Sequence, residues 1–338
     1  MAMFDKLLAN LKASRKTIVF TEGTDARILS AADRLLKEDL MGVILCGGAD
    51  EVKKAASAGG FNVDKAEIID PASYPEFDAM VTKMAELRKG KMTEDECRNL
   101  LKKSNYFGTM LVKMGKADAL LGGATYSTAD TVRPALQIVK TKKGSNLVSS
   151  SFILFREKDG VEEKIAMGDC AINLSYPDKL DKDGNVVLTG AQQLAEVAVE
   201  TARTAAFFGI DPKVAVLSFS TYGSGKGGTV QLSHDAVIEA RKIDPELVID
   251  GEFQFDAAVS TEVAKTKCPD SKVAGQANTF IFPLIEAGNI GYKIAQRLGG
   301  YEAYGPILQG LNAPINDLSR GCNAEEVYKM AIITAGMA

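Results

Sequence analysis

The sequence predicts an α/β fold in which parallel and mixed sheets are flanked by helices. Short apolar runs rich in β-branched residues alternate with longer amphipathic stretches, as in residues 17–20 (TIVF) before 25–38 and residues 213–219 (KVAVLSF) before 229–242. Apolar runs of this kind are typical of strands buried on both faces of a parallel sheet, each followed by a helix. The chain of 338 residues has room for about two domains, each large enough to bury its own core.

The remaining elements follow the same reasoning along the chain. Residues 1–16 carry apolar residues at helical spacing, and further strands are expected at 42–46 (GVILC) and 117–123 (ADALLGG), the latter before a helix at 131–140. Residues 157–164 (EKDGVEEK) and 176–187 (YPDKLDKDGNVV) are interpreted as connections between strands rather than as strand-helix units. The chain ends in a helix whose apolar residues could pack back on the first domain: Val327, Met330, Ala331 and Thr334.

Composition shifts indicate where the domains divide. The basic turn at residues 140–146 (KTKKGSN) leads into a strand-like segment, so a domain change is expected near residue 147. The first domain is then residues 1–147 together with 305–338, and the second is 148–304.

Composition also excludes several classes of protein. The net charge of -4 offers no global positive field for a nucleic acid backbone, and no apolar run is long enough to span a membrane. The single histidine, His234, excludes multi-histidine metal sites, and the five cysteines form no C-x-x-C pair, so no metal site is expected. A cytoplasmic protein with reduced thiols fits these features, because the N-terminal segment lacks the uninterrupted apolar core of a secretion signal.

Three loops carry residues that could perform chemistry. Residues 220–229 (STYGSGKGGT) could hold a phosphate on free backbone N–H groups, and a bare flexible turn explains them equally well. Pro134 suits a first helical position, which would place Arg133 just before a helix N-terminus as an anion ligand, and a surface ion pair with Asp130 is the alternative.

The third loop is residues 316–326 (NDLSRGCNAEE), where a hydroxyl, a guanidinium, a thiol and carboxylates precede a helix. Asn323 and Glu326 also fit a helix cap and its capping-box partner, and spacing alone favours that structural interpretation. Cys322 is interpreted as a packed residue rather than a nucleophile. Arg88, beside a turn at residues 86–96, is interpreted from spacing as a solvated helix end.

Several long motifs together resemble the phosphate acetyltransferase family, also called phosphotransacetylases. They begin with VFTEGTDARIL at residues 19–29 and end with GPILQGLNAPINDLSRGC at 305–322. The resemblance implies two α/β domains arranged as in isocitrate and isopropylmalate dehydrogenases, with the active site in the cleft between them, and a homodimer. It implies reversible acetyl transfer between acetyl phosphate and coenzyme A in acetate metabolism, by direct thiolate attack in a ternary complex and without a prosthetic group.

The resemblance also implies roles for particular residues. Ser319 and Arg320 of DLSRG would sit at the reacting group, where Arg320 neutralises charge and Ser319 donates a hydrogen bond to the tetrahedral species. Arg88 and Arg133 match family arginines that bind anionic parts of the substrates. The family's base, an aspartate seven residues after the serine, aligns with Glu326, which is therefore the first candidate for the base, with Asp317 second.

Three rival functions remain beside this one. Phosphate butyryltransferase differs only in acyl pocket width, which the sequence does not disclose. A non-catalytic acetyl-CoA-sensing domain would be expected to lack the Ser319–Arg320 pair, which this chain retains. A metal-dependent dehydrogenase of the same fold would need a cluster of metal-binding aspartates, which the sequence does not offer.

Overall fold

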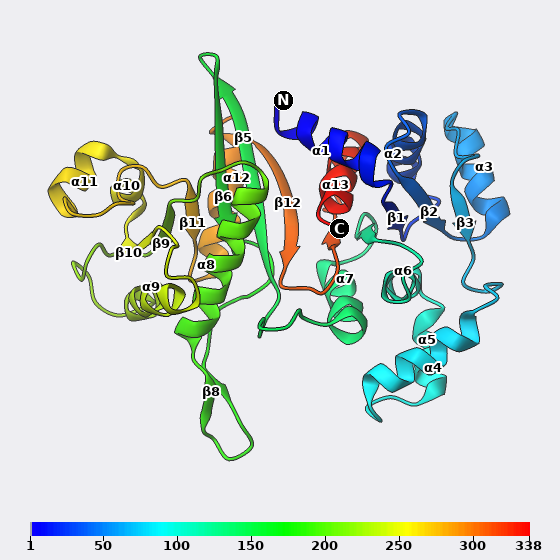
Figure 1. Ribbon diagram of the computed structural model, residues 1–338, viewed down its shortest axis with the longest axis horizontal. Coiled ribbons are helices and arrows are strands. Elements are labelled where there is room, and N and C mark those ends of the chain that lie inside the picture. Colours follow the sequence, from blue (N-terminus) through cyan, green and yellow to red (C-terminus); the bar gives the residue numbers. More distant parts are fainter. Residues whose placement is uncertain (1) are drawn as a thin grey trace. The chain divides into compact units, whose positions relative to one another are not determined.

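The computed structural model describes residues 2–338 and divides the chain into two compact units (Figure 1). Unit 1 comprises residues 1–143 and 311–338, and unit 2 comprises residues 144–310. The sequence placed these divisions at residues 147 and 305.

Unit 1 is built on a fully parallel sheet in the order β13-β4-β1-β2-β3. Its strands are β1 (Thr17–Phe20), β2 (Gly42–Cys46), β3 (Glu67–Ile69), β4 (Ala119–Gly122) and β13 (Ile315–Asp317). Its helices are α1 (Ala2–Ser14), α2 (Ala26–Lys37), α3 (Ala49–Gly59), α4 (Phe77–Arg88), α5 (Glu94–Leu101), α6 (Ser104–Lys113), α7 (Thr128–Pro134), the π-helix η1 (Ala135–Val139) and α13 (Ala324–Gly336).

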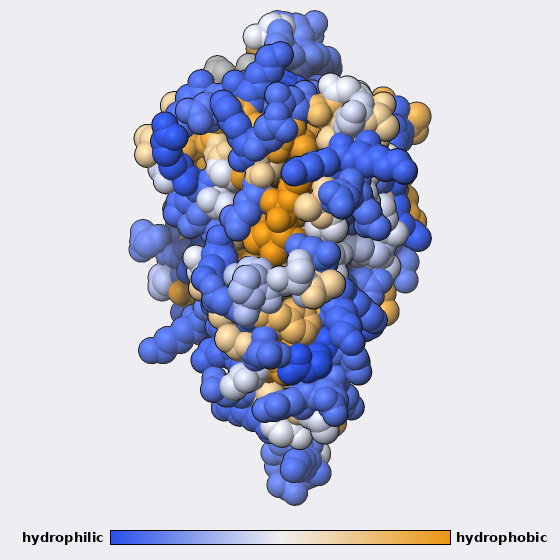
Figure 2. Space-filling view, turned by 90° about the vertical axis from the view of Figure 1, so that its right-hand side faces the viewer, coloured by the Kyte–Doolittle hydropathy of each residue, from blue (hydrophilic) through white to orange (hydrophobic). Residues whose placement is uncertain are grey.

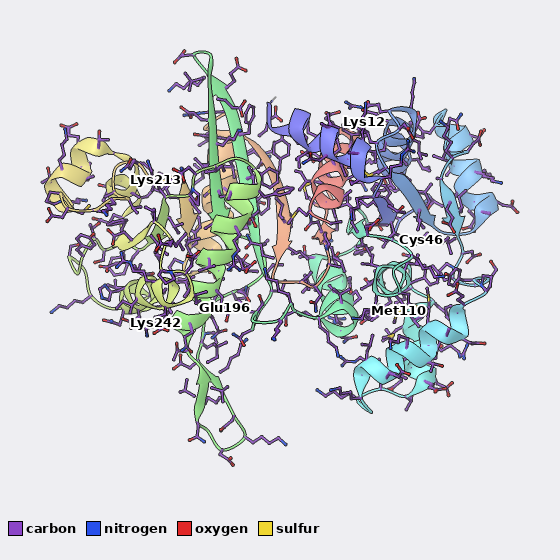
Figure 3. All side chains as sticks on the ribbon, viewed as in Figure 1. Lys12, Cys46, Met110, Glu196, Lys213 and Lys242 are labelled. Atoms are coloured by element: carbon purple, nitrogen blue, oxygen red, sulfur yellow. The ribbon has the colours of Figure 1, made fainter. Side chains whose placement is uncertain are left out.

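Helices cover both faces of this sheet, which explains why its strands are apolar throughout. On one face α4, α5, α6 and η1 form a continuous core with strand residues such as Val19 and Leu120. On the other face α13 packs against α2, β4 and β1, as expected for the returning C-terminal segment. Cys46, at the end of β2, and Met110 of α6 are both buried in this unit (Figure 3).

Unit 2 is built on a mixed sheet in the order β10-β9-β11-β6-β5-β12, where β5 pairs antiparallel with β6 and β12. Its strands are β5 (Ser149–Lys158), β6 (Val161–Gly168), β9 (Val214–Leu217), β10 (Ile249–Phe253), β11 (Thr279–Ile281) and β12 (Glu302–Gln309), and β7 (Lys179–Leu180) and β8 (Val186–Leu188) form a separate hairpin. Its helices are α8 (Gly190–Phe207), α9 (Val230–Ile243), α10 (Phe255–Val259), α11 (Thr261–Lys267) and α12 (Ile285–Arg297).

The expected α/β class with parallel and mixed sheets is confirmed. Among the described helices, none combines the length and the apolar character that crossing a membrane requires. The side of unit 1 that Figure 2 presents is mostly hydrophilic, with apolar residues visible only in patches between polar side chains.

The prediction for Pro134 is wrong. Helix α7 begins at Thr128 after the N-cap Ser127, so Pro134 lies at its end and Arg133 lies in its last turn rather than before an N-terminus. A proline there cannot donate to the Asp130 carbonyl four residues earlier. The structure compensates because the Asn105 side-chain amide donates to that carbonyl at 2.7 Å, and the backbone continues as the π-helix η1.

Candidate active site at the carboxyl edge of the first sheet

The strand order of unit 1 reverses between β1 and β4. From β1 the chain adds β2 and β3 on one side, then returns to add β4 and β13 on the other. In open parallel sheets, ligands bind outside the carboxyl ends of the strands at such a switch point. The loops that follow β1, β4 and β13 meet at this point, and the third of them carries Ser319 and Arg320.

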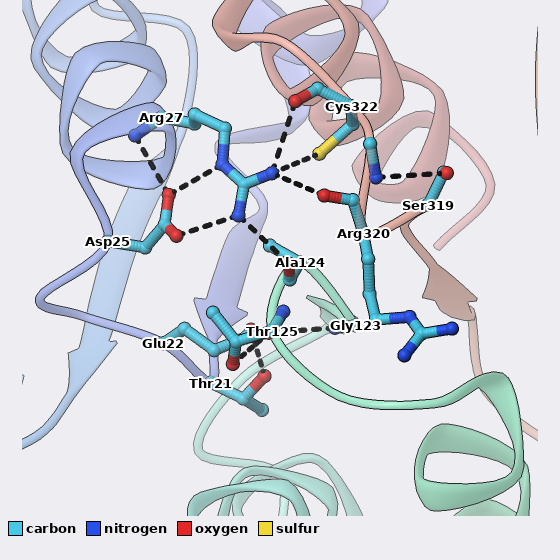
Figure 4. A network of polar contacts seen from close by, with 11 residues as sticks. Thr21, Glu22, Asp25, Arg27, Gly123, Ala124, Thr125, Ser319, Arg320 and Cys322 are labelled. Atoms are coloured by element: carbon cyan, nitrogen blue, oxygen red, sulfur yellow. Dashed lines mark hydrogen bonds and ion pairs between the residues drawn. The ribbon is translucent and has the colours of Figure 1, made fainter.

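Arg27 holds these three loops together (Figure 4). Asp25, the N-cap of α2, fixes the guanidinium with two hydrogen bonds of 3.0 and 2.8 Å. The other guanidinium hydrogens donate to the backbone carbonyls of Ala124 at 2.8 Å, Arg320 at 2.9 Å and Cys322 at 3.1 Å. A planar, rigid donor fork suits this task, and the loop with Ser319 is therefore positioned by its backbone.

The side chains of Ser319 and Arg320 point away from these restraints. Both residues are exposed, and the Ser319 Oγ accepts a 3.2 Å hydrogen bond from the Gly321 N–H. The Arg320 guanidinium makes no hydrogen bond or ion pair to the part of the chain that the structure describes. A hydroxyl and a cation on a fixed backbone are available to a phosphate or a developing oxyanion.

Asp317 lies beneath this loop at the end of β13 and is 1% exposed. Its two carboxylate oxygens accept hydrogen bonds from the hydroxyls of Thr128 at 2.6 Å and Thr131 at 2.5 Å, both on α7. Burial raises the pKa of Asp317 to about 6, and the nearby charge of Glu22 adds to the rise.

Glu22 lies two residues after the end of β1. Its carboxylate accepts hydrogen bonds from the Thr21 hydroxyl at 2.7 Å and from the backbone N–H groups of Gly123 and Thr125 at 3.0 Å each. Burial raises the pKa of Glu22 despite these bonds. Glu22 therefore joins the loop after β1 to the loop after β4.

Glu326 is engaged in the capping box that its spacing predicts. The Asn323 side chain accepts from the Glu326 N–H at 2.9 Å, and the Glu326 carboxylate accepts from the Asn323 N–H at 3.1 Å. Cys322 is buried beside it, and burial raises the pKa of its thiol to about 11, which agrees with a packed residue.

Arg88 and Arg133 gather around Tyr106 on α6. Both guanidinium charges act to lower the pKa of this phenol, although burial raises it overall. The Nε atom of Arg88 is buried and has no hydrogen-bond partner among the described residues, whereas Arg133 is exposed. Asp130 accepts from the Ser127 hydroxyl at 2.7 Å, and no ion pair joins it to Arg133 within residues 2–338.

The structure thus places in unit 1 the residues to which the family resemblance gives a role, whereas the glycine-rich loop at residues 220–229 lies in unit 2. Ser319, Arg320, Asp317 and Glu326 lie on the segment that follows β13, and helix α7 connects Asp317, through Thr131, with Arg133. Sequence reasoning assigned no role to Glu22 or Arg27. Their signal was a cluster of charged residues directly after a buried strand, in the segment TEGTDAR.

The glycine-rich loop at residues 220–229 already binds an anion of its own chain. The carboxylate of Glu252, at the end of β10, accepts from the Ser220 hydroxyl at 2.8 Å and from the Gly223 N–H at 2.7 Å. His234 on α9 is half-exposed, with its Nδ1 at 3.6 Å from the other Glu252 oxygen. The described residues hold no group of three or more His, Cys, Asp and Glu side chains arranged to bind a metal ion.

Known proteins resemble this chain over nearly its whole length. The family described as "Phosphate acetyl/butaryl transferase" matches residues 2–335. The phosphate acetyltransferase of Bacillus subtilis (strain 168) is 51% identical over 321 residues, which cover 95% of this chain and 94% of that protein. The crystal structure of a phosphotransacetylase from Streptococcus pyogenes superposes with a TM-score of 0.91 at 50% identity and covers 99% of this chain and 97% of that one.

Proposed function

We propose that this chain, which belongs to the phosphate acetyl/butyryl transferase family, catalyses reversible acetyl transfer between acetyl phosphate and coenzyme A. The observation that carries the proposal is the Ser319–Arg320 loop, whose backbone is held by Arg27 while its hydroxyl and guanidinium stay exposed. Identity of about one half with phosphate acetyltransferases supports acetyl rather than butyryl transfer. The exposed guanidinium of Arg320 also favours a catalytic site over a domain that only senses acetyl-CoA.

The chemistry proceeds by attack of the coenzyme A thiolate on the acetyl carbonyl within a ternary complex. A thiol with an ordinary pKa of about 8.5 is only a few per cent ionised at neutral pH, so a base that removes its proton accelerates the reaction. The new C–S bond forms a tetrahedral species, whose oxyanion receives a hydrogen bond from Ser319 and the charge of Arg320. The oxyanion then re-forms the carbonyl, the bond between the acyl carbon and the oxygen that bridges it to phosphorus breaks, and phosphate leaves with that electron pair beside the same arginine.

Arg88 and Arg133 serve in this proposal as binding groups for the phosphates of the substrates. The guanidinium charges of both arginines act on the Tyr106 phenol, and guanidinium groups bind phosphates through charge-assisted hydrogen bonds. The unpartnered Nε of Arg88 supports this role, because a buried donor of this kind gains a partner when an anion binds.

Two carboxyl groups compete for the role of base, with Glu326 first and Asp317 second on sequence grounds. Glu326→Gln separates them, because glutamine also fits a capping box and preserves stability. Lower turnover at unchanged stability would assign the base to Glu326. Wild-type turnover would leave Glu326 with its capping role.

The decisive assay mixes acetyl phosphate and coenzyme A without a nicotinamide cofactor and measures thioester formation. Butyryl phosphate in the same assay compares the two acyl groups. Failure to form any thioester at neutral pH would overturn the enzyme assignment, and faster reaction with butyryl phosphate would overturn acetyl selectivity. The cytoplasmic location and the absence of a prosthetic group stay predictions.

A homodimer is also part of the proposal. Helix α12 of unit 2 buries only Gly288 and presents an apolar stripe at intervals of four residues, with Ile290, Ile294 and Leu298 exposed by 57, 53 and 84%. A second copy of the chain would cover this stripe across a two-fold axis. Light scattering should give twice the chain mass for the wild type and a shift to monomer for Ile294→Lys. A monomeric wild type would contradict the dimer.

A further inference from the structure

Asp317 is a carboxyl group that unit 1 encloses almost completely. It is 1% exposed and forms no ion pair with any residue from 2 to 338. Its Oδ1 accepts a hydrogen bond of 2.5 Å from the Thr131 hydroxyl, and Thr131 is itself 1% exposed. Gly123 covers the same oxygen, because a Cβ at that position would come within 2.2 Å of it. A substrate therefore has no access to Asp317 from the Oδ1 side.

The second oxygen of Asp317 is connected to the surface through one hydroxyl group. Thr128, the first residue of α7, donates to Oδ2 at 2.6 Å. Thr128 is half-buried, so among the described side chains that donate to Asp317 it alone also has a surface open to solvent. A hydroxyl accepts one hydrogen while it donates another, so it can pass a proton to the carboxylate behind it.

Thr128 and Ser319 lie at the same edge of the sheet. The Leu318 N–H donates to the Gly122 carbonyl at 2.7 Å, which joins the loop after β13 to the loop after β4. Ser319 follows Asp317 by two residues, so their Cα atoms are at most about 7 Å apart. The Thr128 hydroxyl is therefore close to the hydroxyl and guanidinium that receive acetyl phosphate in the proposed function.

The environment of Asp317 makes it a stronger base than an ordinary carboxylate. Burial raises its pKa to about 6, although the hydrogen bonds from both threonines act to lower it. A thiol of pKa about 8.5 exceeds an ordinary aspartate by about 4.6 in pKa, but exceeds Asp317 by only about 2.5. Proton transfer to Asp317 is correspondingly easier, since a base becomes more effective as its pKa approaches that of the proton donor.

No positive charge neutralises this carboxylate. Glu22, after β1, and Tyr126, after β4, act on Asp317, and neither is a cation. The helices packed against β13 carry further charged groups: Asp130 and Arg133 on α7, and Glu325, Glu326 and Lys329 on α13. None of these groups forms an ion pair with Asp317 within residues 2–338, so its pKa stays above the ordinary range.

We propose that Asp317 accepts the thiol proton of coenzyme A through the Thr128 hydroxyl, an inference that rests on the proposed function and selects Asp317 over Glu326. The S–H bond breaks, and its electron pair forms the bond from sulfur to the acetyl carbon. The proton passes to the Thr128 oxygen while the hydrogen of Thr128 moves to the Oδ2 of Asp317. When the carbonyl re-forms, the same transfers in reverse give the proton to an oxygen of the departing phosphate. Asp317 is then ionised again.

The first test is the pH dependence of kcat for variants of Thr128. Wild-type kcat should fall below about pH 6, where Asp317 is already protonated. Thr128→Val keeps the shape of the side chain but removes the hydroxyl, so kcat at its pH maximum should fall roughly ten-fold or more, with KM within about two-fold. Thr128→Ser restores the hydroxyl and should recover most of that loss. Wild-type kcat in Thr128→Val would overturn the proposal.

Asp317→Asn separates loss of the proton acceptor from damage to the fold. At neutral pH its kcat should fall roughly 10²- to 10⁴-fold. The remaining reaction uses coenzyme A that has already ionised, so its rate should rise about ten-fold per pH unit between about pH 6 and about pH 8. A damaged fold instead loses the same factor at every pH, and a variant that keeps the wild-type acid limb would overturn the proposal.

Thr131→Val is the matched control, because it makes the same change at the oxygen that no substrate can approach. It removes a hydrogen bond that lowers the pKa of Asp317, so the acid limb should move to higher pH while the maximal kcat stays within about three-fold of the wild type. Thr266→Val, on α11 of unit 2, should change neither quantity. An equal loss of maximal kcat in Thr131→Val and Thr128→Val would overturn the relay. Loss of the acid limb in Glu326→Gln would overturn the choice of Asp317.

The melting temperature as a function of pH provides a readout that needs no activity. The folded chain holds the Asp317 proton to higher pH than the unfolded chain, so this stabilisation is complete below the ordinary carboxyl pKa of about 4 and is lost as the pH rises through about 6. Between about pH 4 and about pH 7 the wild type should therefore lose more melting temperature than Asp317→Asn. Equal slopes would overturn Asp317 as the acceptor. A wild type that forms no thioester overturns the proposed function, whereas an active wild type with an equally active Thr128→Val overturns only the relay.

Discussion

Removing the Arg27 guanidinium tests whether the loop with Ser319 and Arg320 is positioned by its backbone. Arg27→Ala deletes three charge-assisted hydrogen bonds to carbonyls on two different loops. At roughly 1 kcal/mol for each partly exposed bond, the loss is about 3 kcal/mol of unfolding free energy. For a unit of this size that corresponds to a decrease in melting temperature of roughly 6–12 °C.

The same change should lower turnover. Two of the three deleted bonds hold the carbonyls of Arg320 and Cys322, so the catalytic loop loses its fixed position and kcat should fall roughly 10- to 100-fold. Arg27→Lys keeps the charge but not the planar fork, and should recover only part of both losses.

Thermal unfolding and thioester formation are measured on the same preparations. Arg98→Ala is the control, because Arg98 forms an exposed ion pair with Asp78 and its removal should cost less than about 1 kcal/mol. If Arg27→Ala unfolds like the control and retains wild-type kcat, the Arg27 bonds do not position the loop and the reasoning is refuted.

Three further predictions concern single contacts. Gly122→Ala places a Cβ within 2.2 Å of two hydroxyl oxygens and should destabilise unit 1 by about 1–3 kcal/mol in thermal unfolding, whereas Gly291→Ala, with its nearest neighbour at 3.5 Å, should not destabilise unit 2. Arg133→Ala should chiefly raise KM for an anionic substrate in steady-state kinetics, and unchanged KM values for both substrates would remove Arg133 from the site. Glu252→Ala leaves two donors of the glycine-rich loop unpaired and should lower the unfolding free energy by about 3 kcal/mol in denaturant titrations, with a loss below about 1 kcal/mol contradicting that account.

The pattern of apolar runs along the sequence was sufficient to predict the α/β fold class. Runs such as residues 17–20 and 213–219 are apolar throughout because helices cover both faces of their sheets, and that burial is visible in composition alone. The capping box of Asn323 and Glu326 was equally predictable, because its hydrogen bonds join residues three apart. Local spacing failed at Pro134, where a distant side chain, Asn105, satisfies the carbonyl that proline leaves unbonded.

Contacts between distant segments were decided only by the tertiary structure. Arg27 and Cys322 are almost three hundred residues apart, and no local pattern indicates that the guanidinium binds the carbonyls of Arg320 and Cys322. The reason is topological: parallel strands bring their carboxyl ends to one edge, and the strand order selects which loops meet there. The sequence by itself therefore determined which elements form and which residue types follow each strand, whereas the fold determined which of those side chains share a site.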